Sequence, residues 1–214
     1  MSGSCCHTAH ESGATGKRYR RVLWGALGVN GAMFLVEVIA GLSAGSVSLQ
    51  ADALDFLADT ATYGITLFIL GKGLRHRALA GLMKGLAMGT FGIWVLGNAV
   101  WHAFSGAVPE SFTMGAVGFA ALVANGLTAA LLLSYRSGDS NMRSVWLCSR
   151  NDAIGNLAVM LAALGVFGTG AGWPDVIVAC IMGGLALQSA RLIVRQASGE
   201  LGALRIPAAI TDRQ

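Results

Sequence analysis

Six long apolar stretches, separated by short polar segments, run along almost the whole chain. A helix needs about 20 predominantly apolar residues to cross the hydrocarbon core of a bilayer. The pattern therefore predicts an all-α integral membrane protein with six transmembrane helices. The second and fifth stretches contain the most polar residues, so a hydropathy window is expected to miss them. The predicted spans are 22–44, 47–70, 79–104, 112–135, 145–168 and 174–195.

Composition agrees with a membrane protein. The 214 residues are 54% hydrophobic and 12% charged. An ordinary globular domain has roughly 45–50% apolar and about 25% charged residues. A soluble protein of this length would need more charge to cover its surface, so the lipid bilayer is the expected solvent. No nucleotide-binding loop or catalytic string is recognisable in the sequence, and an enzyme is not expected.

The positions of the basic residues predict the orientation of the helices. Lys and Arg lie before the first span, between spans two and three, between spans four and five, and after span six. The three other connections, near residues 45, 109 and 172, contain neither. This alternation is what the positive-inside rule gives for six spans with both termini in the cytoplasm of a plasma or inner membrane. The net charge of +4 then reflects topology and not nucleic-acid binding.

Three segments are expected along the chain: a tail over 1–21, a six-helix transport domain over 22–195, and a short tail over 196–214. Both tails are expected in the cytoplasm, where cysteines stay reduced. The first tail contains a cluster of soft-metal ligands, which a flexible peptide can use to bind metal. The alternative is a terminal peptide with incidental residues. The cluster consists of Cys5, Cys6, His7 and His10.

A polar stripe runs through the second predicted span. Its members are spaced by four and three residues, so they share one helix face. Carboxylates at membrane depth are costly and normally face water, a partner or an ion. The stripe therefore predicts the lining of a hydrated ion path; the alternative is a set of hydrogen bonds between helices, which suits the threonines. The stripe comprises Ser48, Asp52, Asp55, Asp59, Thr62 and Thr66.

The fifth predicted span supplies a matching pair. Cys148 and Asp152 are four residues apart, and Asn156 follows four residues later. Two side chains with this spacing can point at one metal ion. With Asp55 and Asp59 they make four oxygen and sulfur ligands, which suit tetrahedral Zn²⁺ better than Mg²⁺, Ca²⁺ or Mn²⁺. Taken alone, Cys148 would be interpreted as a buried structural cysteine.

Other polar residues lie inside predicted spans. Glu37 is expected to be a proton carrier or an ion-pair partner of Arg150, and the ion pair is favoured because buried charges are commonly paired. Asn98 and His102 are expected to make hydrogen bonds rather than bind metal. Candidates for an accessory metal or proton path are Asp52, Glu37, Asn156 and the Cys/His tail.

Two strings resemble signatures of the cation diffusion facilitator family. Residues 46–59 are similar to its helix-two signature, with Asp55 and Asp59 at the ligand positions. Residues 148–156 are similar to its helix-five signature, with Cys148 where the family usually has His. The resemblance implies a homodimeric, proton-coupled exporter of Zn²⁺ and related ions, with no cofactor.

The sequence also departs from the family pattern. It shows neither the cytoplasmic ferredoxin-like C-terminal domain nor a histidine-rich loop before the fifth span, so a short, membrane-domain member is expected. Cys148 shifts the expected preference toward softer ions, with Cd²⁺ second to Zn²⁺. Two alternatives stay open: a membrane metal sensor that binds without transporting, and a transporter that prefers Co²⁺ or Fe²⁺.

Overall fold

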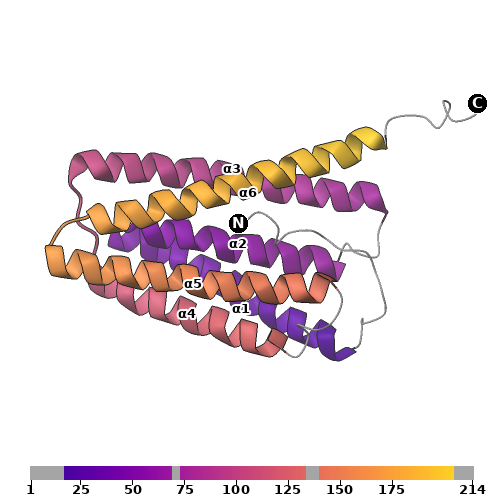
Figure 1. Cartoon of the computed structure of the whole chain (residues 1–214), viewed down its shortest axis with the longest axis horizontal. Coiled ribbons are helices and arrows are strands. Elements are labelled where there is room, and N and C mark those ends of the chain that lie inside the picture. Colours follow the sequence, from indigo (N-terminus) through magenta and orange to yellow (C-terminus); the bar gives the residue numbers. More distant parts are fainter. Residues whose placement is uncertain (1–16, 69–72, 134–139, 205–214) are drawn as a thin grey trace, which may run out of the picture.

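The computed structural model describes residues 17–68, 73–133 and 140–204, with the side chains of 17–19, 132 and 140–151 excepted. These residues form long helices that run roughly parallel or antiparallel to one another (Figure 1). The helices are α1 (Lys17–Ala44), α2 (Val47–Phe68), α3 (Leu74–Ser105), α4 (Ser111–Leu133), α5 (Ser140–Thr169) and α6 (Trp173–Ala203). The described residues contain no strand, so the prediction of an all-α fold is confirmed for them.

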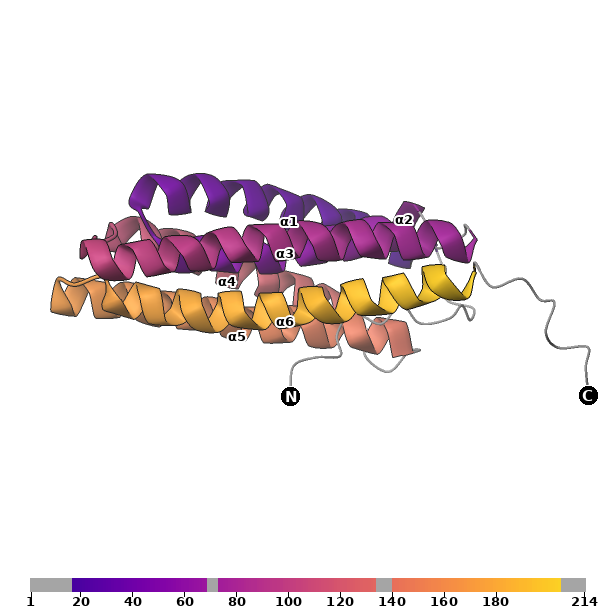
Figure 2. The same ribbon diagram turned by 90° about the horizontal axis from the view of Figure 1, so that it is seen from above.

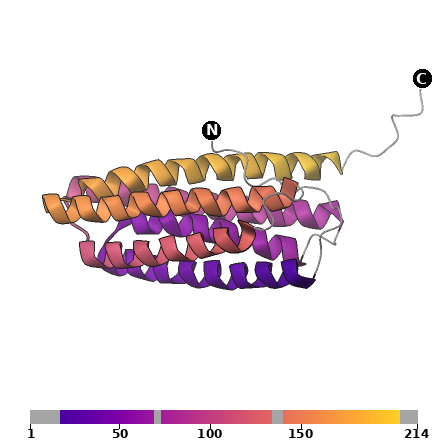
Figure 3. The same ribbon diagram turned by 60° about the horizontal axis from the view of Figure 1, so that its bottom comes forward.

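The helices pack mainly as three pairs: α3 with α6, α4 with α5, and α1 with α2. Figure 2 shows α3 and α6 running side by side along the bundle, and Figure 3 shows α1 and α6 at opposite edges. Among the described helices, α2 alone contacts all five others. It is therefore the central helix, and other helices surround it.

Five of the six described helices are long and apolar enough to cross a membrane, and α2 is the exception. In α5, the part that is long and apolar enough to cross a membrane is Asp152–Thr169. The expectation that a hydropathy window misses the second span is confirmed, whereas the fifth is found over its apolar half. The central position of α2 explains its polarity, because its side chains meet protein instead of lipid.

The outer surfaces of the surrounding helices are apolar. Ile39 on α1, Trp101 on α3, Phe112 on α4 and Phe167 on α5 are all more than half exposed. A protein in water rarely leaves so much apolar surface uncovered. These side chains are positioned to contact lipid.

Four helices, α1, α3, α5 and α6, run past the ends of their predicted spans, and the extensions of α3 and α6 border a pocket. Helix α3 begins at Leu74 instead of residue 79, and α6 ends at Ala203 instead of residue 195. The predicted spans ended where polar residues interrupt the apolar stretch. These polar residues leave the apolar stretch, but the helix continues through them. The extensions lie at the same end of the bundle and form the walls of a pocket described below.

The other end of the bundle is fastened by hydrogen bonds between elements. Asp175 near the start of α6 is fully buried, and its carboxylate accepts from the Ser46 hydroxyl at 2.8 Å and from the Val47 and Ser48 N–H groups at 2.8 and 3.0 Å. The Glu110 N–H donates to the Ala44 carbonyl at 2.9 Å. Asp175 thus caps the N-terminus of α2 from another helix, where a negative charge is favourable.

Candidate metal site

Helix α2 presents Asp55 toward α5. The Oδ2 atom of Asp55 lies 3.9 Å from the position that a Cβ would occupy on Gly155. Asp152 precedes Gly155 by three residues, so it occupies the adjacent turn of the same helix face. The absence of a side chain at Gly155 gives the Asp55 carboxylate room at the contact between the two helices.

Asp59 is held by its own helix. Its side chain is 7% exposed, and its Oδ2 accepts a 2.7 Å hydrogen bond from the hydroxyl of Tyr63, which is also buried. The two residues are four apart, the spacing that brings helix side chains together. The phenol helps to fix the orientation of the carboxylate.

The fourth expected ligand, Cys148, lies in α5, but its side chain is among those that are not described. Within the described part of the chain, no three His, Cys, Asp or Glu side chains gather closely enough to hold a metal ion. Cys5, Cys6, His7 and His10 lie outside the described residues. The four-ligand site therefore stays a prediction.

Glu37 and Asp52 form a separate acidic pair between α1 and α2. Both side chains are 0% exposed, and the two carboxyl groups lie within hydrogen-bonding reach of each other. Among the described residues, no other group donates a hydrogen bond to any of their four oxygens. Two carboxyl groups can bond to each other only through a shared proton. The side chain of Arg150, the expected partner of Glu37, is not described.

The predicted stripe on α2 meets more than one neighbouring helix. Asp52 lies against Glu37 of α1, whereas Asp55 faces α5. Thr62 and Thr66 donate to the carbonyls of Ala58 and Thr62, each at 2.8 Å, as helix threonines commonly do. The spacing of residues in the sequence predicts which side chains share a helix face, but it does not reveal which neighbouring helices that face contacts.

Two asparagines were expected near the site or in helix packing. Asn98 donates to Gln50 Oε1 at 3.1 Å, and Gln50 in turn donates to the Gly41 carbonyl at 3.2 Å. The expected hydrogen-bonding role of Asn98 is thus confirmed, and Gln50 joins three helices. Asn156 is fully buried, and neither polar atom of its amide has a hydrogen-bond partner among the described residues.

Lys84 is a buried charged residue that the sequence analysis did not single out. It lies inside α3 and is 9% exposed. Its Nζ donates to Thr62 Oγ1 at 2.6 Å. The signal was present, since Lys84 falls within the predicted span 79–104 and a cation inside an apolar stretch is costly.

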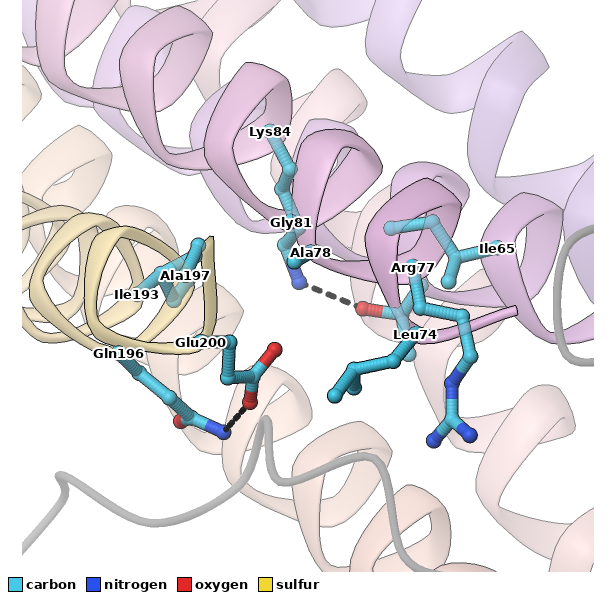
Figure 4. Close-up of a pocket in the computed structure, with 11 residues that line it drawn as sticks. Ile65, Leu74, Arg77, Ala78, Gly81, Lys84, Ile193, Gln196, Ala197 and Glu200 are labelled. Atoms are coloured by element: carbon cyan, nitrogen blue, oxygen red, sulfur yellow. Dashed lines mark hydrogen bonds between the residues drawn. The ribbon is translucent and has the colours of Figure 1, made fainter. Parts of the chain in front are cut away.

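Lys84 extends into a pocket of about 360 Å³ enclosed by α2, α3 and α6 (Figure 4). The polar and charged residues that line this pocket are Thr62, Arg77, Lys84, Gln196 and Glu200. Gln196 donates to Glu200 Oε1 at 3.0 Å, one helix turn apart. The pocket reaches Thr62, which lies one helix turn from Asp59.

The donor chemistry of the described residues suits a divalent cation. Asp55, Asp59 and Asp152 bring three carboxyl groups to α2 and to the facing part of α5 within an apolar bundle. Carboxylate oxygens bind Zn²⁺ and also harder cations. The thiol of Cys148 is the group that would select for softer ions.

Comparison with known proteins agrees with this chemistry. Residues 23–201 match the family described as the cation efflux transmembrane domain. The chain is 29% identical over 196 residues to the zinc transporter ZitB of Escherichia coli, and the match covers 85% of this chain and 62% of that protein.

Two further relatives are similar over shorter lengths. The metal cation efflux system protein CzcD of Cupriavidus metallidurans is 26% identical over 170 residues, covering 74% of this chain and 54% of that protein. A cadmium, cobalt and zinc/H⁺-K⁺ antiporter of Bacillus subtilis is 27% identical over 173 residues, covering 72% and 54%. The chain thus spans less than two thirds of the length of these relatives. Because the family match extends over α1 to α6, the chain belongs to the cation efflux family, the cation diffusion facilitators.

Proposed function

We propose that this protein exports divalent transition-metal cations from the cytoplasm, Zn²⁺ first and Cd²⁺ second, in exchange for protons. The observation that carries the proposal is the position of Asp55, which faces α5 at Gly155, one turn from Asp152. The names of the relatives, which include zinc, cadmium and cobalt transporters, support the same class of cargo.

The proposed site consists of Asp55, Asp59, Asp152 and Cys148. Carboxylates and thiolates bind a metal ion only when deprotonated, so binding the ion releases protons and protonation releases the ion. The ion enters from the cytoplasm, the helices then open the site to the opposite side, and protons displace the ion there. Proton exchange follows from the ligands themselves and needs no further group.

The proposed assembly has six spans, both termini in the cytoplasm and two copies of the chain. Helix α2 crosses the membrane inside the bundle although its mean hydropathy is too low to be recognised as a span. Small residues on the outer helix faces allow two membrane domains to pack closely.

Flux through proteoliposomes tests the proposal. The full chain, reconstituted with a pH gradient across the vesicle membrane, should take up Zn²⁺, and Asp59→Asn or Asp152→Asn should reduce the rate at least about tenfold, since each removes one anionic ligand. Glu110→Gln is the matched control, because it makes a similar change at an exposed residue outside the site.

The result that overturns the proposal is equally specific. Equal Zn²⁺ flux in Asp59→Asn, Asp152→Asn and the wild type would exclude the site. Tight Zn²⁺ binding without flux under any gradient would instead identify a membrane metal sensor.

A further inference from the structure

We propose that Lys84 is a built-in counter-cation at the cytoplasmic mouth of the metal path, which weakens metal binding from that side and keeps the site exchangeable. The inference rests on the proposed metal site. It concerns a residue outside the ligand set, on a helix that supplies none of the expected ligands.

The placement of Lys84 is the first step. Its ammonium group is 2.6 Å from Thr62 Oγ1, and Thr62 follows Asp59 by three residues on α2. Side chains three residues apart on a helix have Cβ atoms roughly 5–6 Å apart. The charge of Lys84 therefore lies within roughly 10 Å of the Asp59 carboxylate.

The pocket is the second step. It lies between the start of α3 and the end of α6, at the end of the bundle that the proposed topology places in the cytoplasm. Lys84 extends into it, and Figure 4 shows the hydrogen bond from its ammonium group to the neighbouring helix. An ion that reaches Asp59 through this pocket passes the ammonium group.

Charge balance is the third step. Asp55, Asp59 and Asp152 are three acidic groups on facing helices of an apolar bundle, where negative charge is costly to bury. A fixed cation nearby offsets part of that charge when no metal is bound. It also repels a divalent ion, so the charge of Lys84 lowers the affinity of the site for the metal.

The other charged groups at the pocket do not take over this role. Arg77 and Glu200 line the pocket from α3 and α6 with opposite charges, and Glu200 accepts a hydrogen bond from Gln196. Lys84 is the charged residue of the pocket for which the structure shows a hydrogen bond to α2.

The test compares variants of the purified full chain. Lys84→Gln removes the charge but keeps a hydrogen-bond donor, and Lys84→Met is a second neutral variant. We expect both to bind Zn²⁺ about tenfold more tightly in equilibrium titrations, because a unit charge at this distance from a divalent ion is worth at least that factor after screening. The maximal rate of Zn²⁺ flux should fall, because tighter binding slows release.

Matched controls separate charge from packing. Lys84→Arg keeps the charge and should bind Zn²⁺ like the wild type. Thr62→Val removes the hydrogen bond but leaves the ammonium group, and it should also keep wild-type affinity. Thermal unfolding in detergent identifies any variant that fails to fold, and the remaining neutral variant then carries the test.

Unchanged or weaker Zn²⁺ affinity in a folded neutral variant would overturn the inference while leaving the proposed function intact. The same holds if Thr62→Val tightens binding as much as Lys84→Gln, since the hydrogen bond would then be the cause. A wild-type chain that binds neither Zn²⁺ nor Cd²⁺ would instead refute the proposed function, and this inference with it.

Discussion

Individual acidic side chains in this bundle are stabilised in different ways, and the difference separates their roles. Asp175 accepts three hydrogen bonds at the start of α2, so it is a structural cap. Asp59 accepts a hydrogen bond from Tyr63 of its own helix. Glu37 and Asp52 have only each other among the described residues. Burial alone would not distinguish these residues, whereas their hydrogen-bond partners do.

Glu110 gives a pH prediction at the residue scale. Its carboxylate accepts from the Thr113 and Phe112 N–H groups at 2.8 and 3.0 Å. Hydrogen bonding with the Thr113 side chain first, and then with these two N–H groups, lowers its pKa below the ordinary 4.5. The ionised carboxylate therefore favours the folded first turn of α4. This contribution is fully present above pH 4.5 and is lost as the pH falls through the lowered pKa.

Hydrogen exchange of the Thr113 amide, followed from pH 6 to pH 3, measures this effect. Protection should decline toward the acid end in the wild type. Glu110→Ala should show little decline, since it lacks the titrating group. Equal pH dependence in both proteins would contradict the assignment.

Among the helices, α2 shows why polarity and burial coexist here. It contacts every other described helix, so its three aspartates meet side chains and helix ends instead of lipid. The helices that surround α2 provide the apolar exterior of the bundle. The pair α3 and α6 approaches closely because glycines lie at its contacts: a Cβ on Gly85 would lie 2.8 Å from Val194 Cγ2 and 3.2 Å from the Val194 backbone nitrogen.

Gly85→Ala should therefore destabilise the protein by about 1–3 kcal/mol, since overpacking against backbone cannot be relieved by a side-chain rotation. Gly97→Ala on the same helix is the matched control, because a Cβ there meets nothing within 4 Å. The control should be neutral or more stable by up to about 1 kcal/mol through higher helix propensity. Chemical unfolding in detergent measures both free energies, and equal values would show that the contact at Gly85 is not tight.

For the whole molecule, the proposed six-span topology makes a labelling prediction. In a variant without native cysteines, Val108→Cys between α3 and α4 should react with a membrane-impermeant maleimide in intact cells. Arg75→Cys near the start of α3 should react only after permeabilisation. The two positions lie at opposite ends of α3, and both native side chains are exposed.

Leu161→Cys is the control for this experiment. The native side chain is 65% exposed and lies in the middle of the apolar stretch Asp152–Thr169 of α5. It should therefore face lipid and resist labelling from either side. Labelling of Val108→Cys and Arg75→Cys from the same side would refute the six-span arrangement.

The sequence by itself determined the all-α class, the helices and the residues worth testing, because hydropathy and helical spacing are local properties of the chain. It also identified the family through the strings at 46–59 and 148–156. It placed Asp55, Asp59 and Asp152 on α2 and α5, but their joint role with Cys148 is still a prediction.

Only the tertiary structure decided which helix faces meet. It made α2 central, directed Asp52 to α1 and Asp55 to α5, and revealed Asp175 as the cap of a helix more than 120 residues away in sequence. It also showed that Lys84 is a buried charge that donates a hydrogen bond to Thr62 of α2. These contacts join residues distant in sequence, and local periodicity contains no information about which faces of different helices come together.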